Sequence, residues 1–204
     1  MDIQKHARDI VYRQGGIAKS ADFVAEGISA VKVVALCDEG LLKRVSHGYY
    51  SLAEHNIISR EQILAKLFSK GIVCVESALF HYGYSDFAPR KWSIAVPRSM
   101  SRTKIRDNIL PLRTYYVRHG IYELGKTSGS FNGVTLPVYD RERTICDCFK
   151  YRTRFDTEIF NKALNAYAND PNKNLQNFYA YAKKLRVHKK VTELMDVLLN
   201  YEQS

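Results

Sequence analysis

Hydrophobic residues recur with a helical period in three successive segments near the start of the chain, which predicts helices over residues 2–14, 20–26 and 29–39. Glycines end each segment, and Ser20 and Ser29 are placed to cap the second and third helices. The residues expected to face a common core are Ile3, Ala7, Ile10, Val11, Phe23, Val24, Val33, Leu36, Cys37 and Leu41. The pattern therefore predicts a small helical core whose last two helices are joined by a tight turn.

The hydrophobic pattern changes directly after the third helix. Residues 41–44 and 49–52 are expected to be short strands joined by a turn at 45–48, which predicts a basic hairpin. Helix–turn–helix followed by such a hairpin is typical of a winged helix-turn-helix, whose second motif helix enters the DNA major groove. We expect this DNA-binding domain to occupy residues 1–55, with a polar connection at 53–58.

The face of the third helix that remains for DNA carries little charge. Arg, Lys, Asn and Gln are the usual readers of base edges, and only Lys32 is of this kind. Ala30 or Val31 could instead contact a thymine methyl. The residues expected to reach DNA from this helix and the wing are Ser29, Ala30, Lys32, Lys43, Arg44, Ser46, His47 and Tyr49. The alternative is that the third helix is one more core helix.

The remaining chain mixes short strands with helices. Ser59 and Gln62 form a capping box for a helix, and Asn132-Gly133 is a strong hairpin turn. Strands are expected at 72–75, 92–96, 113–117, 121–124 and in the hairpin 129–139, with a helix at 76–82. We predict an α+β fold: the N-terminal winged helix-turn-helix, then a C-terminal mixed domain at 56–204 with a small β-sheet and a helical tail.

Four helices form the predicted tail. Asp140 and Asp156 are placed to cap the first two, over 141–154 and 157–168, and two more are expected at 175–186 and 189–201. In the first of them, Ile145, Cys148 and Phe149 make an apolar stripe. The basic residues of that helix, Arg143 among them, are expected on its outer side.

The positive charge lies outside the winged helix. The chain carries a net charge of +10, yet residues 1–55 hold seven basic and seven acidic residues, whereas 56–204 hold 24 and 14. Such an excess favours polyanionic partners, nucleic acid above all, although a solvated surface is the simpler alternative. The basic residues expected to contact DNA phosphates are Arg90, Lys91, Arg98, Arg102, Lys104, Arg106, Arg113, Arg118, Lys150, Arg152, Arg154, Lys183, Lys184, Arg186, Lys189 and Lys190.

The sequence lacks the motifs of the common enzyme classes. It has no phosphate-binding glycine loop, no H-E-x-x-H and no G-x-S-x-G, and Glu123-x-x-Lys126 has the wrong spacing for a nuclease carboxylate–lysine pair. The four cysteines, with no second Cys/His pair at ligand spacing, are expected to be reduced thiols rather than metal ligands. No apolar run is long enough to span a membrane, and the N-terminus does not read as a signal peptide. We expect a cytoplasmic, non-enzymatic protein without cofactor or metal.

Three stretches and their order along the chain carry a family resemblance. They are GIS…ALCDEGLLKRVSHGYYSL, SALFHYGYSDFAPRKWSIAVPR and VYDRERTICDCFKYR. Together they resemble the AbiEi antitoxins of bacterial type IV toxin–antitoxin systems, which act in abortive infection and phage resistance, and the resemblance covers nearly the whole chain. In that family the third helix commonly exposes Arg or other polar readers, where this chain has Ala30, Val31 and Ala35.

The resemblance implies two functions. One is repression of the protein's own operon, by binding inverted repeats in the promoter as two copies of a chain that is monomeric in solution. The other is antagonism of a co-encoded nucleotidyltransferase toxin, without a stable complex, through the C-terminal domain. Two alternatives stay open: a nucleic-acid-processing enzyme tethered by the winged helix, and an antitoxin that binds its toxin directly.

Overall fold

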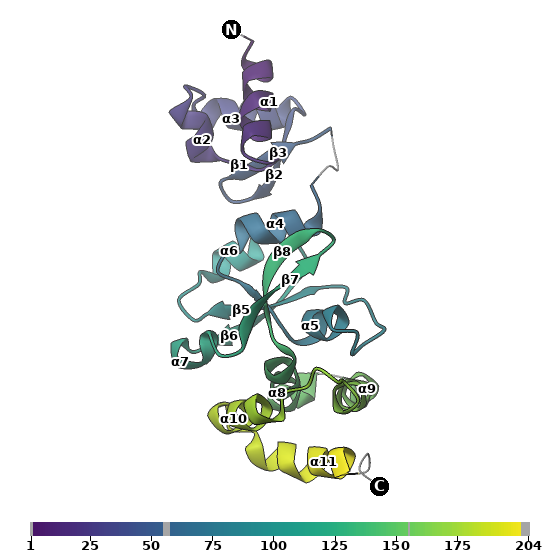
Figure 1. Ribbon diagram of the computed structural model, residues 1–204. Helices are drawn as coiled ribbons and strands as arrows, with labels where there is room; N and C mark the ends of the chain where they lie inside the picture. Colours follow the sequence, from purple (N-terminus) through teal and green to yellow (C-terminus); the bar gives the residue numbers. More distant parts are fainter. Residues whose placement is uncertain (1, 55–57, 155, 201–204) are drawn as a thin grey trace. The chain divides into compact units, whose positions relative to one another are not determined.

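The structure is a computed structural model that describes residues 2–54, 58–154 and 156–200 of an α+β protein (Figure 1). The chain forms two compact units. The first, here called the winged-helix unit, comprises Met1–Ser69 and Met100–Leu110. The second, the sheet unit, comprises Lys70–Ser99 and Pro111–Ser204. Within the described residues, no helix has the length and apolar character needed to cross a membrane.

The winged-helix unit contains the predicted three helices and hairpin. Its small antiparallel sheet has the strand order β1-β3-β2, and the short strand β1 was not predicted. The elements are α1 (Ile3–Arg13), β1 (Ala18–Lys19), α2 (Ser20–Ala25), α3 (Ala30–Asp38), β2 (Leu42–Ser46) and β3 (Tyr49–Leu52). Ile10, Phe23, Val33 and Leu36 meet in one core, as the hydrophobic period predicts.

The structure confirms the predicted cap of α3 but not the predicted cap of α2. Ser29 caps α3 as predicted, because its Oγ accepts the Lys32 N–H at 3.3 Å. The predicted cap of α2 is wrong: Lys19 occupies the cap position, and its N–H donates to the Asp22 carboxylate at 2.7 Å. Val24 is also wrongly assigned to the core, since it is exposed while its neighbour Phe23 is buried. The six-residue helix α2 has room for only one inward side chain.

Two further helices belong to the winged-helix unit. α4 (Arg60–Leu67) begins with the predicted Ser59–Gln62 capping box, and Lys66 Nζ on this helix donates to the Gln14 carbonyl at 3.1 Å. α6 (Arg102–Arg106) was not predicted, and it leads into residues that bond to the wing. The compact unit is therefore larger than the 1–55 segment in which we expected the DNA-binding domain.

The sheet unit is built on a mixed five-stranded sheet with the order β6-β5-β4-β8-β7. The β4–β8 and β5–β6 pairs are parallel, and the β4–β5 and β7–β8 pairs are antiparallel. The elements are β4 (Ile72–Val73), α5 (Val75–His81), β5 (Trp92–Pro97), β6 (Leu112–Val117), α7 (His119–Tyr122), β7 (Lys126–Phe131) and β8 (Val134–Tyr139). The predicted hairpin at Asn132-Gly133 is confirmed, with positive φ at both residues.

One strand prediction in this unit is wrong. Residues 121–124 were expected to be extended, but residues 119–122 form the helix α7. Ile121 and Tyr122 both pack on the same core, which two neighbouring residues of a strand could not do. The Tyr122 hydroxyl also donates to the Lys70 carbonyl, which holds the helix in place.

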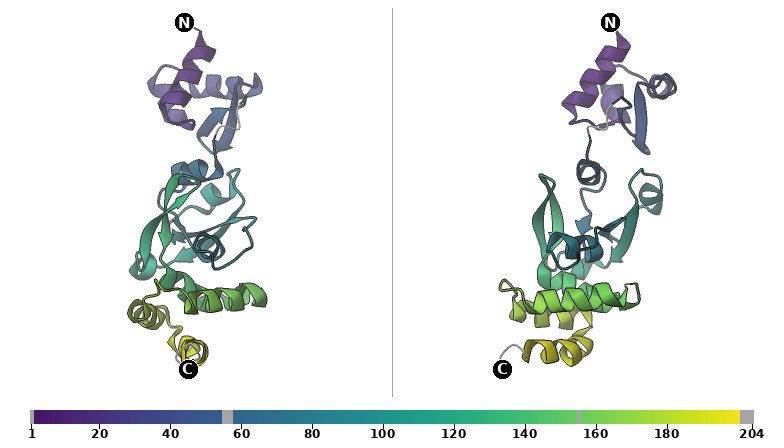
Figure 2. Two further views of the ribbon diagram at one scale, coloured as in Figure 1. Left: turned by 45° about the vertical axis from the view of Figure 1, so that its right-hand side comes forward. Right: turned by 90° about the vertical axis from the view of Figure 1, so that its right-hand side faces the viewer.

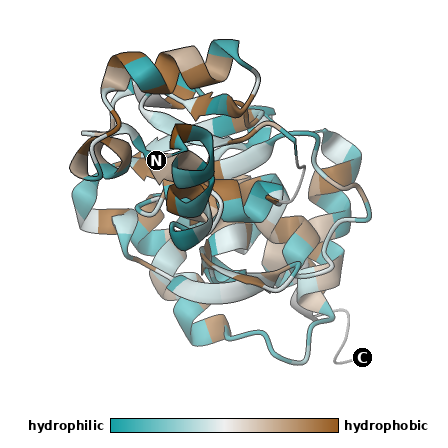
Figure 3. Ribbon diagram, turned by 90° about the horizontal axis from the view of Figure 1, so that it is seen from above, coloured by the Kyte–Doolittle hydropathy of each residue, from teal (hydrophilic) through white to brown (hydrophobic). Residues whose placement is uncertain are grey.

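The tail helices pack together at one end of the sheet (Figures 1 and 2). They are α8 (Arg141–Lys150), α9 (Thr157–Ala168), α10 (Leu175–Leu185) and α11 (His188–Asn200), with a single 3₁₀ turn at Arg152–Arg154. Asp140 and Asp156 cap α8 and α9 as predicted. Figure 3 shows the chain coloured by hydropathy: hydrophobic and hydrophilic bands alternate along its helices, as expected where one side of a helix is buried.

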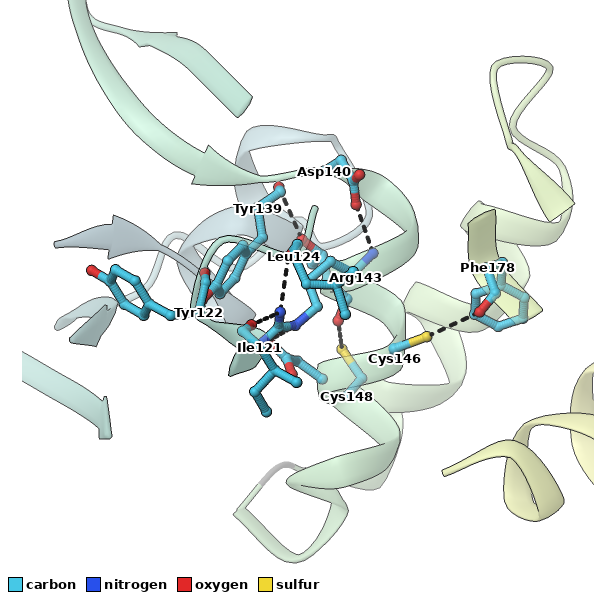
Figure 4. A network of polar contacts seen from close by, with 11 residues as sticks. Ile121, Tyr122, Leu124, Tyr139, Asp140, Arg143, Cys146, Cys148 and Phe178 are labelled. Atoms are coloured by element: carbon cyan, nitrogen blue, oxygen red, sulfur yellow. Dashed lines mark hydrogen bonds and ion pairs between the residues drawn. The ribbon is translucent and has the colours of Figure 1, made fainter. Parts of the chain in front are cut away.

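Arg143 organises the start of the tail from the inside (Figure 4). The prediction that it lies on the outer side of its helix is wrong, because its side chain is completely buried. Its Nη1 donates to the carbonyls of Ile121 at 2.7 Å and Leu124 at 2.8 Å, and its Nε pairs with Asp147 at 3.1 Å. The guanidinium also lies 4.1 Å from the centre of the Tyr139 ring. These partners compensate most of the buried charge, while Arg143 Nη2 and Asp147 Oδ1 have no hydrogen-bond partner among the described residues.

The neighbours of Arg143 on α8 join further parts of the tail. Glu142 Oε1 accepts the Asn174 N–H at 2.7 Å and the Tyr167 hydroxyl at 3.3 Å. Cys146 and Cys148 are buried free thiols that donate to the carbonyls of Phe178 and Thr144. The Asp140–Thr144 stretch, part of the segment that carried the family resemblance, thus has a structural role.

We predict that replacing Asp140 with asparagine changes how the stability of the sheet unit depends on pH. Burial raises the pKa of Asp140 to about 6. The folded state therefore binds this proton more tightly than the unfolded chain, so the contribution of Asp140 to stability falls as pH rises from about 4 to about 6. The asparagine of the variant cannot titrate, yet its amide oxygen can still accept the Arg143 N–H.

The measurement is urea unfolding of both proteins between pH 4 and pH 7. The stability of the Asp140→Asn variant relative to the wild type should rise across that range. Asp156→Asn is the matched control, since Asp156 caps α9 in the same way at an exposed position. A difference from wild type that stays constant with pH would contradict the prediction.

Candidate nucleic-acid interface

The outward face of α3 is apolar. Val31 is 81% exposed and Val34 is 53% exposed, with Ala30 exposed beside them. Val34 was not among the predicted outward residues, although its position three residues after Val31 on the same helix could have indicated it. Large exposed apolar side chains on one helix face are typical of a contact surface.

The one lysine of this face is already paired within the fold. Lys32 Nζ lies 3.0 Å from Glu39 Oε1, and the amide of Gln4 donates to Glu39 Oε2 at 3.2 Å. The hydrogen bond from Lys32 lowers the pKa of Glu39. A base edge would have to compete with Glu39 for the Lys32 ammonium, so the free face of α3 consists mainly of methyl groups.

The wing presents a guanidinium held by its own turn. Arg44 is exposed at the end of the hairpin, and its Nη2 bonds to His47 Nδ1 at 2.7 Å. An acceptor role for Nδ1 leaves Nε2 of the neutral imidazole as the donor. Lys43 and Tyr49 are half-buried on the same hairpin, and Tyr50 is the tyrosine that faces the core.

Ser46 does not lie on the surface that was expected to face DNA. Only 3% of it is exposed, and its Oγ donates to the Asp107 carbonyl at 2.8 Å. The Ile109 N–H donates to the Val45 carbonyl at 3.0 Å, and Ser46 forms a bridge with Asn108. The segment after α6 therefore pairs with the outer edge of β2 and buries the serine.

This pairing brings additional positive charge to the wing. Arg106 is 80% exposed on its side chain, and it lines a shallow depression of about 370 Å³ together with Arg44. Its Nε pairs with the neighbouring Asp107 at 3.0 Å. Arg102 is exposed on the same helix, whereas the side chain of Lys104 lies outside the described residues. Residues 1–55 have no net charge, so the excess positive charge at the wing comes from Arg102 and Arg106, about 60 positions further along the chain.

The other predicted basic residues belong to the sheet unit and fall into separate groups. Arg90 and Lys91 are exposed before β5, and Arg113 on β6 pairs with Glu76. The tail residues Lys183, Lys184, Arg186, Lys189 and Lys190 are exposed around the junction of α10 and α11. Arg152 donates to Thr157 Oγ1 at 2.9 Å. The remaining four are Arg98, which follows β5, Arg118, which follows β6, Lys150 at the end of α8, and Arg154 in the 3₁₀ turn.

A second feature of the sheet unit was not predicted. Glu76 accepts the Ser93 hydroxyl at 2.7 Å and the Tyr115 hydroxyl at 3.1 Å, at the end of a cleft of about 430 Å³. Val75, directly before it, has a φ of 51°, which is strained for a β-branched residue. No sequence motif marks this cleft. Among the described residues, no cluster of His, Cys, Asp and Glu side chains could hold a metal ion.

The helices, the paired wing and the exposed face of α3 define a winged helix-turn-helix of the DNA-binding class. Residues 8–53 match the family model described as "Transcriptional regulator, AbiEi antitoxin", so this part of the chain is an AbiEi antitoxin and transcriptional regulator domain. The match confirms the family resemblance for the winged helix. DNA binding is what a regulator of this family implies.

A solved structure has a similar fold. The crystal structure of the RV2827C protein from Mycobacterium tuberculosis is similar with a TM-score of 0.55 and 12% sequence identity. The similarity covers 93% of this chain and 80% of that chain, and at this identity it establishes a shared fold. A comparison with curated proteins finds no match.

Proposed function

We propose that this protein is a bacterial type IV antitoxin and transcriptional autorepressor that acts in the cytoplasm. Two copies, each monomeric in solution, occupy inverted repeats in the promoter of their own operon. The protein also counteracts a co-encoded nucleotidyltransferase toxin without a stable complex. The DNA-binding part is supported by the exposed apolar face of α3, together with the arginines that the same unit presents at the wing and on α6. The family of residues 8–53 supports the antitoxin part.

The chemistry of α3 suggests how it reads sequence. Val31, Val34 and Ala30 offer methyl groups to the major groove, and the matching feature of a base pair there is the thymine C5-methyl. Lys32 is occupied by Glu39, so hydrogen bonds to base edges have a minor part. Thymine methyls give specificity in this proposal, and phosphate contacts from Arg44, Arg102 and Arg106 give most of the affinity.

The test is binding of the promoter with thymine replaced by deoxyuridine, measured by fluorescence anisotropy. Removing one contacted methyl costs about 0.8 kcal/mol, so affinity should fall by about fourfold for each contacted thymine. In a Val31→Thr variant, which exchanges one methyl for a hydroxyl, the same DNA change should cost less. Val24→Thr is the matched control, because Val24 is exposed on α2 instead of α3. Equal affinity of the wild type for thymine and deoxyuridine DNA would overturn methyl reading.

Repression and toxin antagonism need separate measurements. A reporter fused to the promoter should be repressed by the full chain and released by the Val31→Thr variant. Sedimentation should show one copy free in solution and two copies on the operator. Co-expression with the neighbouring toxin should restore growth, while the purified proteins do not co-elute. Co-elution of the two would favour direct binding instead.

A further inference from the structure

Two arginines begin side by side at one end of the sheet in the sheet unit. β5 and β6 are parallel, and their last register pair is Pro97 with Val117. Arg98 and Arg118 follow directly, so both leave the sheet at the carboxyl ends of neighbouring strands. In open α/β sheets, ligands bind outside the carboxyl ends of parallel strands. Both arginines are exposed.

Lys150 approaches the same place from the end of α8. The next residue, Tyr151, packs against β6, because its ring lies 4.7 Å from the ring of Tyr115. Burial lowers the pKa of Lys150, Asp147 raises it, and repulsion from Arg143, Arg118 and Arg98 lowers it. Lys150 Nζ lies 5.4 Å from the centre of the Tyr151 ring. The Arg154 guanidinium lies 5.6 Å from that ring and 5.5 Å from the Tyr115 ring. Lys150 and Arg154 thus lie over two tyrosines that pack against the strand from which Arg118 leaves.

Within the described residues, three of these four charges have no ion-pair partner. Across the described parts of the chain, no carboxylate forms an ion pair with Arg98, Arg118 or Lys150. Asp147, the acid that acts on Lys150, is bonded to Arg143. The C-terminus of α8 accounts for the position of Lys150, because helix dipoles favour cations there. It does not account for two arginines brought to the same place by the sheet.

We propose that Arg98, Arg118 and Lys150, with Arg154 at the rim, form a site for a compact and multiply charged phosphate group, such as the polyphosphate of a nucleotide. Guanidinium groups bind phosphate oxygens in pairs, and an ammonium adds a point charge. Cations that converge on one place match the concentrated charge of a diphosphate or triphosphate better than single charges spaced along a DNA backbone. The site is independent of operator recognition by the winged-helix unit.

Isothermal titration of the full chain with inorganic pyrophosphate, ATP, AMP and adenosine at ~150 mM salt tests the proposal. Pyrophosphate and ATP should bind, AMP should bind more weakly, and adenosine should give no heat. Hydrogen bonds between charged groups contribute roughly 1.5–3 kcal/mol, so Arg98→Ala or Arg118→Ala should each lower affinity by about tenfold or more. Lys150→Met should act in the same direction. The matched control is Arg90→Ala with Lys91→Ala, which removes two exposed cations from the opposite end of β5.

A second measurement separates binding from folding. The clustered cations repel one another, so removing one should leave the melting temperature unchanged or raise it while pyrophosphate affinity falls. Operator affinity measured on the same variants shows whether pyrophosphate binding and the proposed operator binding depend on the same residues. The proposal is overturned if pyrophosphate does not bind the wild type, or if the control variant loses as much affinity as Arg98→Ala. Tighter binding of an oligonucleotide without terminal phosphate than of pyrophosphate would also overturn it.

Discussion

Replacing Arg143 with methionine should lower the free energy of unfolding of the sheet unit by about 3–5 kcal/mol, the usual loss when one member of a buried ion pair is removed. Asp147, whose carboxylate is also buried, loses its partner in this variant. The carbonyls of Ile121 and Leu124 lose their donor as well. Urea unfolding followed by tryptophan fluorescence measures the effect, because Trp92, the single tryptophan, lies in the sheet unit.

The control for this prediction lies two residues away on the same helix. Arg141 pairs with Asp170 at 2.9 Å but is partly exposed, so Arg141→Met should cost less than about 1 kcal/mol. The double variant Arg143→Met, Asp147→Leu should recover a large part of the loss, since it removes both buried charges. If Arg143→Met were as stable as Arg141→Met, the buried pair would not have the role assigned to it.

The features that the sequence predicts well are those decided by a few neighbouring residues. Ser29, Asp140 and Asp156 each cap a helix with a side chain that bonds to a backbone N–H two or three residues on. The Asn132-Gly133 turn likewise depends only on the ability of two adjacent residues to adopt positive φ. These signals located the winged helix, the hairpin and the tail helices without knowledge of the tertiary structure.

The features it misses depend on residues far apart in the chain. Arg143 was placed outside because a helical stripe does not show that two carbonyls from residues 121 and 124 and a tyrosine ring surround it. The strand predicted at 121–124 is wrong because Ile121 and Tyr122 pack on a core that other strands form, and residues 119–122 are helical there. The local sequence pattern predicts whether a segment is a helix or a strand, but tertiary contacts decide which of its sides is buried.

In the candidate DNA-binding site, too, the sequence predicts some features and misses others. The sequence indicated the α3 face and the wing, but the burial of Ser46 depends on a carbonyl of Asp107, 61 residues later. The basic residues from 90 to 118 are close together in sequence, and all of them were expected to contact DNA phosphates. The fold assigns Arg102 and Arg106 to the winged-helix unit and Arg98 and Arg118 to the sheet unit. Closeness in sequence therefore did not predict which charges act together.

This division leads to the second large effect that we expect. Replacing Arg44, Arg102 and Arg106 together with alanine should lower operator affinity by about 100-fold at ~150 mM salt. A phosphate contact contributes a factor of about five at this salt concentration, because binding releases counterions, and three contacts multiply. The slope of log K against log salt should fall in magnitude by up to about three. Fluorescence anisotropy over a range of salt concentrations measures both quantities.

The matched control removes the same charge from the same unit. Lys5, Arg8 and Arg13 lie on α1, where Arg8 pairs with Glu54 and Arg13 pairs with Glu26. Replacing these three with alanine changes the net charge equally, so it tests whether position or total charge determines binding. If the position of the charges determines binding, the α1 variant should show a slope of log K against log salt close to that of the wild type. Equal losses in the two triple variants would show that the arginines beside the wing attract DNA only through the overall field, and the assignment of phosphate contacts to α6 would then be wrong.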